Sequence, residues 1–456
     1  MRHWPLLSGV LVLGALVSSG CSNAPGYSWT GGTWTFSPNG TLVAYLAGIT
    51  AADRGTLTVQ PVGGGNATPI ASNVMPRTLR FSPDGTHLAF EDGNSTLWVA
   101  PLTGGTPVQI AAHAANLWFT PDSATVLFEQ DCADTCVLAR ASVLGGAVTP
   151  VNPAVASYVG VAGFSADGQQ LVISDAAGDL WTLALSGGTP VHVAANAYGV
   201  RMTPDGHHVT FMTDHTLHVA PVDGSGSPGI VLATGANIGG ALFSPDGTHA
   251  VFFPSLTHTL IGVSSDGQSS SLIATEVNGD VAFSPTGKQL AIVVDADPNG
   301  FGTLETVSVS GGTPTPIAQG AGRPQFLPDG RMLFLAHWDP NSQAGSLYMF
   351  SGTGAPVKLA DGAAIVRLSP DGQHAALGLG WDTTWQRGTL ATSATAAGPA
   401  VSIDADVSDF QVSPDGLHVG FVRGMHPLSS SSIVGVGTLE IAPIAGGSPV
   451  KIADQG

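Results

Sequence analysis

The sequence predicts an all-β protein, a β-propeller built from about ten four-stranded antiparallel blades. One turn motif recurs along nearly the whole chain, short apolar segments follow it, and no segment has the apolar spacing of an amphipathic helix. Gly (61) and Pro (32) together form about a fifth of the 456 residues, as expected where short strands are joined by many turns.

The recurring motif is a turn phrase of the type Phe-Ser-Pro-Asp-Gly. Pro presets φ at the second corner and Gly accepts a positive φ at the fourth, so the chain reverses between two antiparallel strands. Some copies depart from this consensus, at Asn39, Ser123, Ala166, Thr286 and Leu327, and a turn tolerates these substitutions. The ten copies begin at Phe36, Phe81, Phe119, Phe164, Met202, Phe243, Phe283, Phe326, Leu368 and Val412.

Each unit supplies four short strands, as the residues around the second copy illustrate. The strand before the turn phrase is the first, and an alternating apolar segment at His87–Phe90 is the second. The third is Leu97–Pro101, and a Gly-Gly turn leads into the fourth at Thr106–Ile110. Four strands in about 42 residues, repeated without a helix, is typical of a propeller blade.

Ten such units fill most of the chain after Cys21. We assign residues 1–20 to a signal peptide, 21–29 to a short linker and 30–456 to the propeller. One blade cannot bury both of its faces, so neighbouring blades must stack. Ten blades could form one wide ring or two smaller propellers, and the lack of any linker or composition change favours one ring.

The N-terminus has the features of an export signal. Arg2 and His3 precede an apolar stretch from about Leu6 to Val17, which is too short to cross a bilayer as a helix. The residues that end at Cys21 resemble a bacterial lipobox, in which the cysteine is diacylated and becomes the mature N-terminus. Ser18 departs from the usual Leu or Val, so an ordinary signal peptide with a nearby cysteine stays as the alternative.

Two further cysteines, Cys132 and Cys136, stand close together in the chain. Outside the cytoplasm such a pair is expected to form a disulfide that closes a small loop. A metal site that uses both thiolates with Asp131 or Asp134 is the alternative, and it lacks further soft ligands.

The charge balance excludes one class of partner. Lys and Arg total 14 against 32 Asp and Glu, which gives a net charge of −18, and the chain has no basic run. Phosphate backbones would repel such a protein, so we expect no binding to nucleic acid.

Two patterns raise the question of a metal. Asp295, Asp297 and Asn299 match the first half of a calcium loop, but Thr306 holds the place of the bidentate Glu. An ordinary connection between strands explains the same residues. Histidines also recur two places after the turn glycine and could form a ring, although a polar surface position is the simpler interpretation; they are His87, His208, His249, His374 and His418. We predict no metal and no cofactor.

Three arginines, Arg80, Arg201 and Arg367, directly precede a turn phrase. In a propeller the strand before the turn lines the central channel, so these residues are candidates at the channel mouth for an anionic ligand or a peptide carboxylate. Pairing with Asp residues of adjacent turns is the alternative that we favour. Asp280 and Asp409 are further charges on the same strands.

The tryptophans divide into two groups. Trp98 and Trp181 occupy matching third-strand positions and are expected to pack inside blades. Trp338, Trp381 and Trp385 are the better surface candidates, because they lie near long connections. The longest connections, residues 381–388 and 424–437, are where we expect a partner to touch.

The repeat resembles a known one. Phe-Ser-Pro-Asp-Gly-x-x-Leu-Ala-Phe, then Leu-Trp-Val and a Gly-Gly turn, looks like the WD-repeat-like propeller repeat of the TolB family, and it occurs also in prolyl-oligopeptidase-type enzymes and the tricorn protease. The resemblance covers about residues 30–453. The α/β domain that precedes a TolB propeller and the Gly-x-Ser-x-Gly elbow of the hydrolases have no counterpart here. The resemblance therefore implies a propeller alone.

From these observations we expect a lipid-anchored propeller of the cell envelope that acts as a non-enzymatic scaffold for envelope proteins, similar to the TolB propeller. The anchor at Cys21 would attach it to a membrane, most simply the outer one, facing the periplasm or the exterior. A propeller lyase or hydrolase acting on glycans or peptides, and a protein that binds sugars or small anions, are the alternatives. No catalytic residue is assigned.

Overall fold

The computed structural model describes residues 33–50, 52–132, 136–151, 158–226, 229–235, 241–254, 258–382, 387–396, 398–427 and 435–455. These residues form 37 strands and no helix, which confirms the all-β class. The signal peptide at 1–20, Cys21 and the linker at 21–29 lie outside the described residues. None of the described segments is a helix that is long and apolar enough to span a bilayer.

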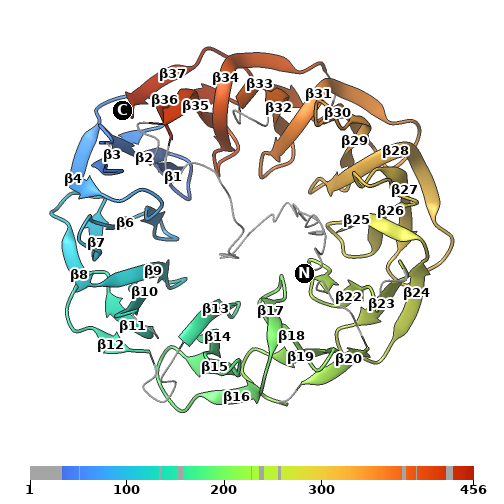
Figure 1. Cartoon of the computed structure of the whole chain (residues 1–456), viewed down its shortest axis with the longest axis horizontal. Helices are drawn as coiled ribbons and strands as arrows, with labels where there is room; N and C mark the ends of the chain where they lie inside the picture. The colour runs from blue at the N-terminus through green and yellow to red at the C-terminus, as the bar shows by residue number, and fades with distance from the viewer. Residues whose placement is uncertain are drawn as a thin grey trace, which may run out of the picture.

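The strands form ten blades that stand around one common centre (Figure 1). In each blade, the order of strands in space follows the order in sequence, and all neighbours are antiparallel. The first strand lies nearest the centre and the fourth lies on the outside (Figure 1). The predicted β-propeller of about ten four-stranded antiparallel blades is therefore confirmed.

Blades 1 to 6 are separate four-stranded sheets. Blades 1 to 3 contain β1 (Trp34–Phe36), β2 (Leu42–Ala47), β3 (Gly55–Pro61), β4 (Thr68–Val74), β5 (Arg80–Phe81), β6 (His87–Glu91), β7 (Thr96–Pro101), β8 (Val108–Ala112), β9 (Ala114–Phe119), β10 (Thr125–Gln130), β11 (Val137–Ser142) and β12 (Thr149–Pro150). Blades 4 to 6 contain β13 (Tyr158–Phe164), β14 (Gln170–Asp175), β15 (Leu180–Ala184), β16 (Val191–Ala194), β17 (Tyr198–Met202), β18 (His208–Thr213), β19 (Thr216–Pro221), β20 (Ile230–Thr234), β21 (Leu242–Phe243), β22 (His249–Phe252), β23 (Leu260–Ser264) and β24 (Ser270–Ala274).

Blades 7 to 10 form one continuous sheet of 13 strands. Three strands of 12 residues each serve as the outer strand of one blade and then as the inner strand of the next. Each bends at a residue with positive φ, namely Gly320, Gly362 or Asp406. The strands are β25 (Val277–Phe283), β26 (Gln289–Val294), β27 (Gly302–Ser308), β28 (Thr315–Phe326), β29 (Met332–Asp339), β30 (Ala344–Phe350), β31 (Val357–Leu368), β32 (His374–Asp382), β33 (Arg387–Ala394), β34 (Val401–Val412), β35 (His418–Pro427), β36 (Gly435–Pro443) and β37 (Val450–Asp454).

The hydrophobic core lies between blades. The described residues form ten apolar clusters, and each joins a different pair of neighbouring blades. One of them packs Trp34 and Phe36 of blade 1 against Leu439 and Ile441 of blade 10. The ring is thus closed by packing between its first and last blades.

The second strands are more buried than an alternating pattern suggests. In β6, the consecutive residues Leu88, Ala89 and Phe90 are all buried. Both faces of a blade are covered by its neighbours, so successive side chains enter two different cores. This explains why these strands consist of short apolar runs.

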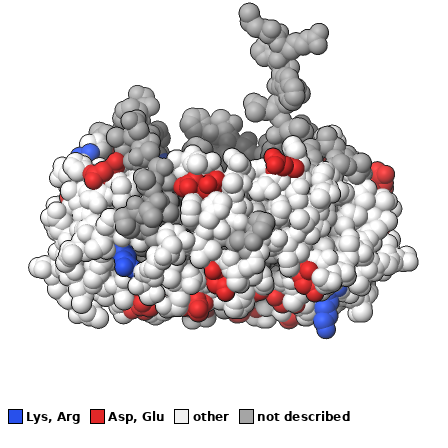
Figure 2. Space-filling model, turned by 90° about the horizontal axis from the view of Figure 1, so that it is seen from below, with Lys and Arg blue, Asp and Glu red and all other residues white. Residues whose placement is uncertain are grey.

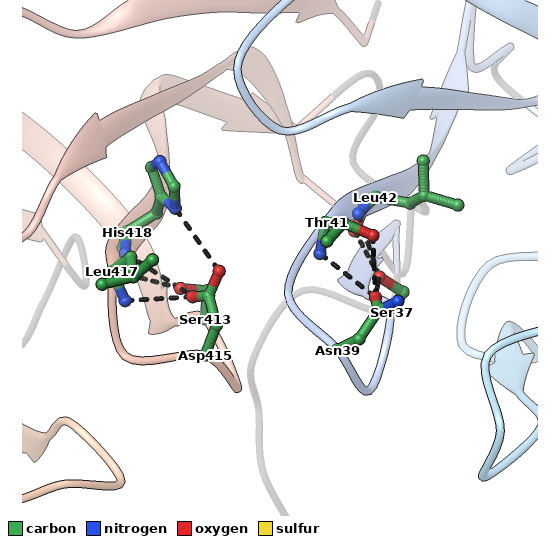
Figure 3. A network of polar contacts seen from close by, with 8 residues as sticks. All are labelled: Ser37, Asn39, Thr41, Leu42, Ser413, Asp415, Leu417 and His418. Atoms are coloured by element: carbon green, nitrogen blue, oxygen red, sulfur yellow. Dashed lines mark hydrogen bonds and ion pairs between the residues drawn. The ribbon is translucent and has the colours of Figure 1, made fainter.

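The turn phrase is held by its own side chains, as Figure 3 shows for blades 10 and 1. The Ser413 hydroxyl donates to Asp415 Oδ1, which also accepts the Leu417 N–H at 3.0 Å. Ser413 Oγ in turn accepts the N–H of His418 at 2.9 Å. In blade 1, Asn39 replaces the Asp and accepts the equivalent serine hydrogen bond at 2.7 Å. The third turn position is therefore the acceptor that organises the turn.

The turns of adjacent blades touch one another. Gly40 has φ of 70°, and a Cβ there would lie 2.4 Å from Cγ of Asp415 in the neighbouring blade. Gly85 has φ of 71° and more room, with Pro38 Cδ of blade 1 at 3.7 Å. We call this end of the ring the turn face. The opposite end, which carries the hairpins between second and third strands, is the hairpin face.

The outer surface carries few charges. Figure 2 shows a largely uncharged side of the ring, with acidic side chains toward its edges and few basic ones. This agrees with a chain in which only 10% of the residues are charged.

Candidate functional site

Four charged side chains lie on the first strands of four consecutive blades, 7 to 10. They are Asp280, Arg323, Arg367 and Asp409, on β25, β28, β31 and β34. These strands face the centre of the ring (Figure 1). We call this set the inner-wall charge row.

Asp409 is the most buried member of the row, with 6% of its surface exposed. Burial raises its pKa from 3.8 to about 6, and the nearby Trp34 indole and Arg367 guanidinium lower it only in part. Trp34 lies near Asp409, and Trp34 Nε1 and Asp409 Oδ2 are both buried without a hydrogen-bond partner of regular geometry among the described residues. This carboxyl group therefore gains or loses a proton near pH 6.

Asp280 and Arg323 connect blade 7 to blade 8. Asp280 Oδ2 accepts a hydrogen bond of 2.9 Å from the backbone N–H of Arg323. Arg323 has φ of 55°, an unfavourable conformation for a residue with a side chain, and it sits where the pairing of β28 with β29 is irregular. Burial raises the pKa of Asp280, and burial lowers that of Arg323. The carboxylate thus holds a strained segment of the inner wall.

The Arg323 guanidinium lies over aromatic rings. Its Cζ atom is 4.1 Å from the centre of the Trp338 ring and 5.5 Å from that of Phe301. The two rings are stacked, with centroids 5.0 Å apart. A guanidinium placed over an indole ring can still donate its N–H groups to an acceptor, which suits recognition of a carboxylate.

The three arginines named from the sequence lie on inner strands of blades 2, 5 and 9, which are not neighbours. Glu91 acts electrostatically on Arg80 and Asp409 acts on Arg367, and neither acid belongs to a turn phrase. Within the described residues, no ion pair joins Arg80, Arg201 or Arg367 to an Asp of a turn phrase. The structure therefore does not bring Arg80, Arg201 and Arg367 into one site.

The tryptophans differ in part from expectation. The indole N–H of Trp98 donates to Asp92 at 3.0 Å, and that of Trp181 donates to Asp175 at 2.8 Å, which agrees with a role inside blades. Trp381 was expected near the surface, but it is only 8% exposed and packs against Phe410 with ring centroids 6.0 Å apart. It folds back over Gly388, whose missing side chain leaves the room that Trp381 fills.

Trp338 takes the corresponding place in blade 8 and is half-buried, over Gly345. Trp385 lies outside the described residues. Among the three surface candidates, Trp338 is therefore the one that the structure places beside a charged group of the inner wall.

The five repeated histidines contribute backbone hydrogen bonds to the turns. All are half-buried at the start of a second strand, and each donates its backbone N–H to the turn Ser or Thr hydroxyl. Within the described residues, no three His, Cys or carboxylate groups gather there closely enough to hold a metal.

The segment that resembles half a calcium loop is a hairpin between β26 and β27. Asp297 Oδ1 accepts the N–H groups of Asn299 at 2.8 Å and Phe301 at 3.0 Å, so it stabilises its own turn. Asp295 joins no group of three possible ligands among the described residues. The simpler interpretation as a strand connection accounts for these contacts.

The predicted disulfide is present. Cys132 and Cys136 are joined with an S–S distance of 2.04 Å. Glu129, which the sequence did not single out, places Oε2 at 3.8 and 3.6 Å from the two sulfur atoms. These three residues are the only possible metal-ligand group of this size in the described part of the chain.

The hairpin face is uneven. The hairpins β29–β30, β32–β33 and β35–β36 continue past an irregularity in their pairing, after Ala336, Leu379 and Arg423. Their strands have 7 to 10 residues, against 4 to 7 in the second and third strands of blades 1 to 7. We call these three hairpins the crown surface.

Charged pairs lie on and beside the crown surface. Arg387 contacts Asp406 at 2.9 Å, and Arg423 contacts Asp404 at 3.1 Å and Glu440 at 3.4 Å. A shallow depression beside β33 is lined by Leu379, Gly380, Asp382, Arg387, Gly388, Thr389 and Asp406. The segments 383–386 and 428–434, which belong to the predicted contact regions, lie outside the described residues.

Arg323 and Trp34 are site residues that the sequence reasoning missed. Asp280, Arg323 and Asp409 each stand three residues before their turn phrases, so superposing the repeats on that phrase would have found Arg323. Trp34 precedes the first turn phrase, and only closure of the ring brings it to Asp409 of blade 10. Nothing in the sequence indicates that Trp34 and Asp409 lie close together.

Comparisons with known proteins support the fold alone. No protein-family model matches the chain, and no curated protein matches it. A crystal structure of the eukaryotic initiation factor matches with TM-score 0.56 and 14% identity, covering 91% of this chain and 96% of that one. TolB from Acinetobacter baumannii matches with TM-score 0.28 and 15% identity, covering 50% of this chain and 62% of that one. An oligogalacturonate lyase from Vibrio parahaemolyticus matches with TM-score 0.39 and 14% identity, covering 68% and 93%. At these identities the likeness says nothing about activity.

Proposed function

We propose that this protein is a lipid-anchored propeller of the cell envelope that acts as a non-enzymatic scaffold, and that its protein partner binds the crown surface. The extra length of the crown hairpins carries this proposal. About three additional residues on a strand extend it by roughly 10 Å, and blades such as 2 and 6 pack without that length. Connections on a rigid propeller are where recognition commonly resides.

The chemistry around the crown favours a protein partner. Half-exposed ion pairs such as Arg387–Asp406 can exchange partners at modest cost, because both side chains remain in contact with water. Arg323, which is held over Trp338 near the same face, presents a guanidinium edge suited to an acidic side chain. Asn341, Ser342 and Gln343 at the tip of β29–β30 are exposed.

The experiment compares two variants of the tagged full-length chain, purified in detergent and cross-linked in envelope extract. Asn341→Arg adds a bulky charge to the crown surface. Gln268→Arg adds the same group to an exposed turn on the turn face of blade 6. The two sites have matching local structure. The backbone N–H of Asn341 donates to Asp339 Oδ1 at 2.9 Å, and that of Gln268 donates to Asp266 Oδ1 at 3.0 Å.

We expect one or two saturable partners with the wild type and Gln268→Arg, and at least about a tenfold lower yield with Asn341→Arg. Equal recovery with both variants would move the partner away from the crown surface. A wild type that captures no protein but turns over or retains a glycan or peptide would favour an enzyme or a ligand-binding protein.

A further inference from the structure

The disulfide in blade 3 has a buried carboxylate beside it. Glu129, at the end of β10, is 9% exposed, and its Oε2 atom lies 3.8 Å from Cys132 Sγ and 3.6 Å from Cys136 Sγ. A disulfide sulfur carries no hydrogen, so these contacts are not hydrogen bonds to the carboxylate. The disulfide itself therefore gains no hydrogen bond from Glu129.

The repeat does not require an acid at this position. Glu129 stands ten residues after the start of its turn phrase, Phe119, and the same place holds Ser174 in blade 4 and Met212 in blade 5. Glu91 holds it in blade 2, where the nearby charge is Arg80 and no sulfur lies in the segment. A buried carboxylate beside two sulfurs is thus particular to blade 3.

A second side chain orients this carboxylate. Asn116 Nδ2 donates a hydrogen bond of 2.9 Å to Glu129 Oε2. Asn116 has φ of 43° and stands where the pairing of β9 with β10 is irregular, so a bulge aims its amide at Glu129. Such outer hydrogen bonds to a ligand are typical of metal sites.

The distances suit a tetrahedral ion. With metal bonds of about 2.3 Å to sulfur and about 2.1 Å to oxygen, the oxygen and sulfur ligands of a tetrahedral zinc site lie about 3.6 Å apart. The observed oxygen–sulfur distances of 3.8 and 3.6 Å already match this ligand-to-ligand distance. Only the two sulfurs must separate, to about 3.8 Å, and they can do so once the bond between them is broken.

We propose that the reduced form of this protein binds one zinc-like divalent cation through Cys132 Sγ, Cys136 Sγ and Glu129 Oε2, with a fourth position open to water. A dithiol donates two electrons and two protons to the disulfide and is itself oxidised to a disulfide. The cation then displaces the two thiol protons as the thiolates bind it. Oxidation of the thiols by a disulfide-forming partner releases the ion, so the site responds to the redox state of its surroundings.

The test uses the full-length chain, reduced without oxygen by a phosphine, and Co²⁺ as the probe. Reduced wild type should bind one Co²⁺ with thiolate-to-cobalt charge-transfer absorption, and the oxidised form should show none. Cys132→Ser and Cys136→Ser should abolish the absorption. Asn116→Ala should weaken binding by about 10- to 100-fold, and Glu129→Gln by at least as much. Glu91→Gln removes the equivalent carboxylate of blade 2 and should leave the affinity for Co²⁺ unchanged.

Circular dichroism on the same samples reports whether the reduced chain keeps its strands. Reduced wild type without cobalt–thiolate absorption, folded or unfolded, would overturn the proposal. Equal affinity in Glu129→Gln and wild type would also overturn it, because the two cysteines alone would then account for the binding.

Discussion

The side-chain amide of Gln455 donates a hydrogen bond of 3.1 Å to the hydroxyl of Thr33. This contact joins the last blade to the first, across 422 residues of sequence. Gln455 is fully buried, and its backbone carbonyl also accepts the N–H of Ile49 at 2.7 Å. Because every blade is built from consecutive strands, no strand crosses this seam, and closure depends on such contacts and on the Trp34 cluster.

Replacement of Gln455 by Ala should weaken ring closure. It leaves the Thr33 hydroxyl without this partner, which we expect to lower the free energy of unfolding by about 1–3 kcal/mol. The midpoint of urea unfolding measures this. Lys451→Ala is the control, because Lys451 and Asp454 form an exposed pair whose loss should cost at most about 1 kcal/mol. Equal midpoints for the two variants would contradict the role of Gln455.

Substitution of two turn glycines distinguishes the cost of backbone strain from the cost of a steric clash between blades 1 and 10. Gly40 and Gly85 have nearly the same φ, 70° and 71°, so Ala at either site should cost about 1–2 kcal/mol through its backbone. Only at Gly40 would the new Cβ collide with the side chain of Asp415 in blade 10. We therefore expect Gly40→Ala to lower the melting temperature more than Gly85→Ala. The reverse order would show that the turns of blades 1 and 10 are not in contact.

Asp409 should make stability fall as the pH rises. Its pKa is about 6 in the folded chain and 3.8 in the unfolded one, so the folded state holds the proton more tightly. Ionisation of Asp409 therefore lowers the free energy of unfolding. This penalty is absent below pH 3.8, grows between about pH 4 and 6, and reaches about 3 kcal/mol at neutral pH.

Asp409→Asn should remove this penalty. Melting temperatures of wild type and variant, measured from pH 4 to 8, should diverge in favour of the variant as the pH rises. Asp266→Asn is the control, because hydrogen bonds from Ser264 and Gln268 lower the pKa of Asp266 below 3.8, so its effect on stability should stay nearly constant from pH 4 to 8. A constant difference between wild type and Asp409→Asn would mean that Asp409 does not titrate in this range.

The lipid anchor predicted from the sequence rests on one residue. Cys21→Ser removes the thiol that would be acylated, and we expect the protein to move from the membrane fraction to the soluble envelope fraction. Fractionation followed by immunodetection measures this, with Ser22→Ala as the control. Membrane association that persists in Cys21→Ser would exclude Cys21 as the anchor.

The sequence predicted the fold well because each blade repeats the same local rules. Pro and Gly in the turn phrase place the turns, and the apolar segments after them place the strands. The site was less predictable, because its contacts join different repeats. Trp34 meets Asp409 only across the seam, and Arg323 reaches Trp338 only because β28 passes from blade 7 into blade 8.

Burial was also hard to predict for residues that depend on a neighbour. Trp381 precedes a long connection and resembles a surface residue in sequence, yet it folds back over Gly388 and is buried. The sequence shows both residues but not their contact. Glu129 beside the two cysteines is a similar case, since its role depends on the bulge at Asn116.

Site-specific photo-cross-linking in living cells tests most directly whether a partner protein binds the crown surface. A photoreactive residue placed at position 341 lies on the crown, and one at position 268 lies on the turn face, both in exposed turns. We predict a discrete cross-linked band of higher mass from position 341 and none from position 268. A band from position 268 alone, or from neither position, would contradict the account of this protein as a scaffold that binds its partner through the crown.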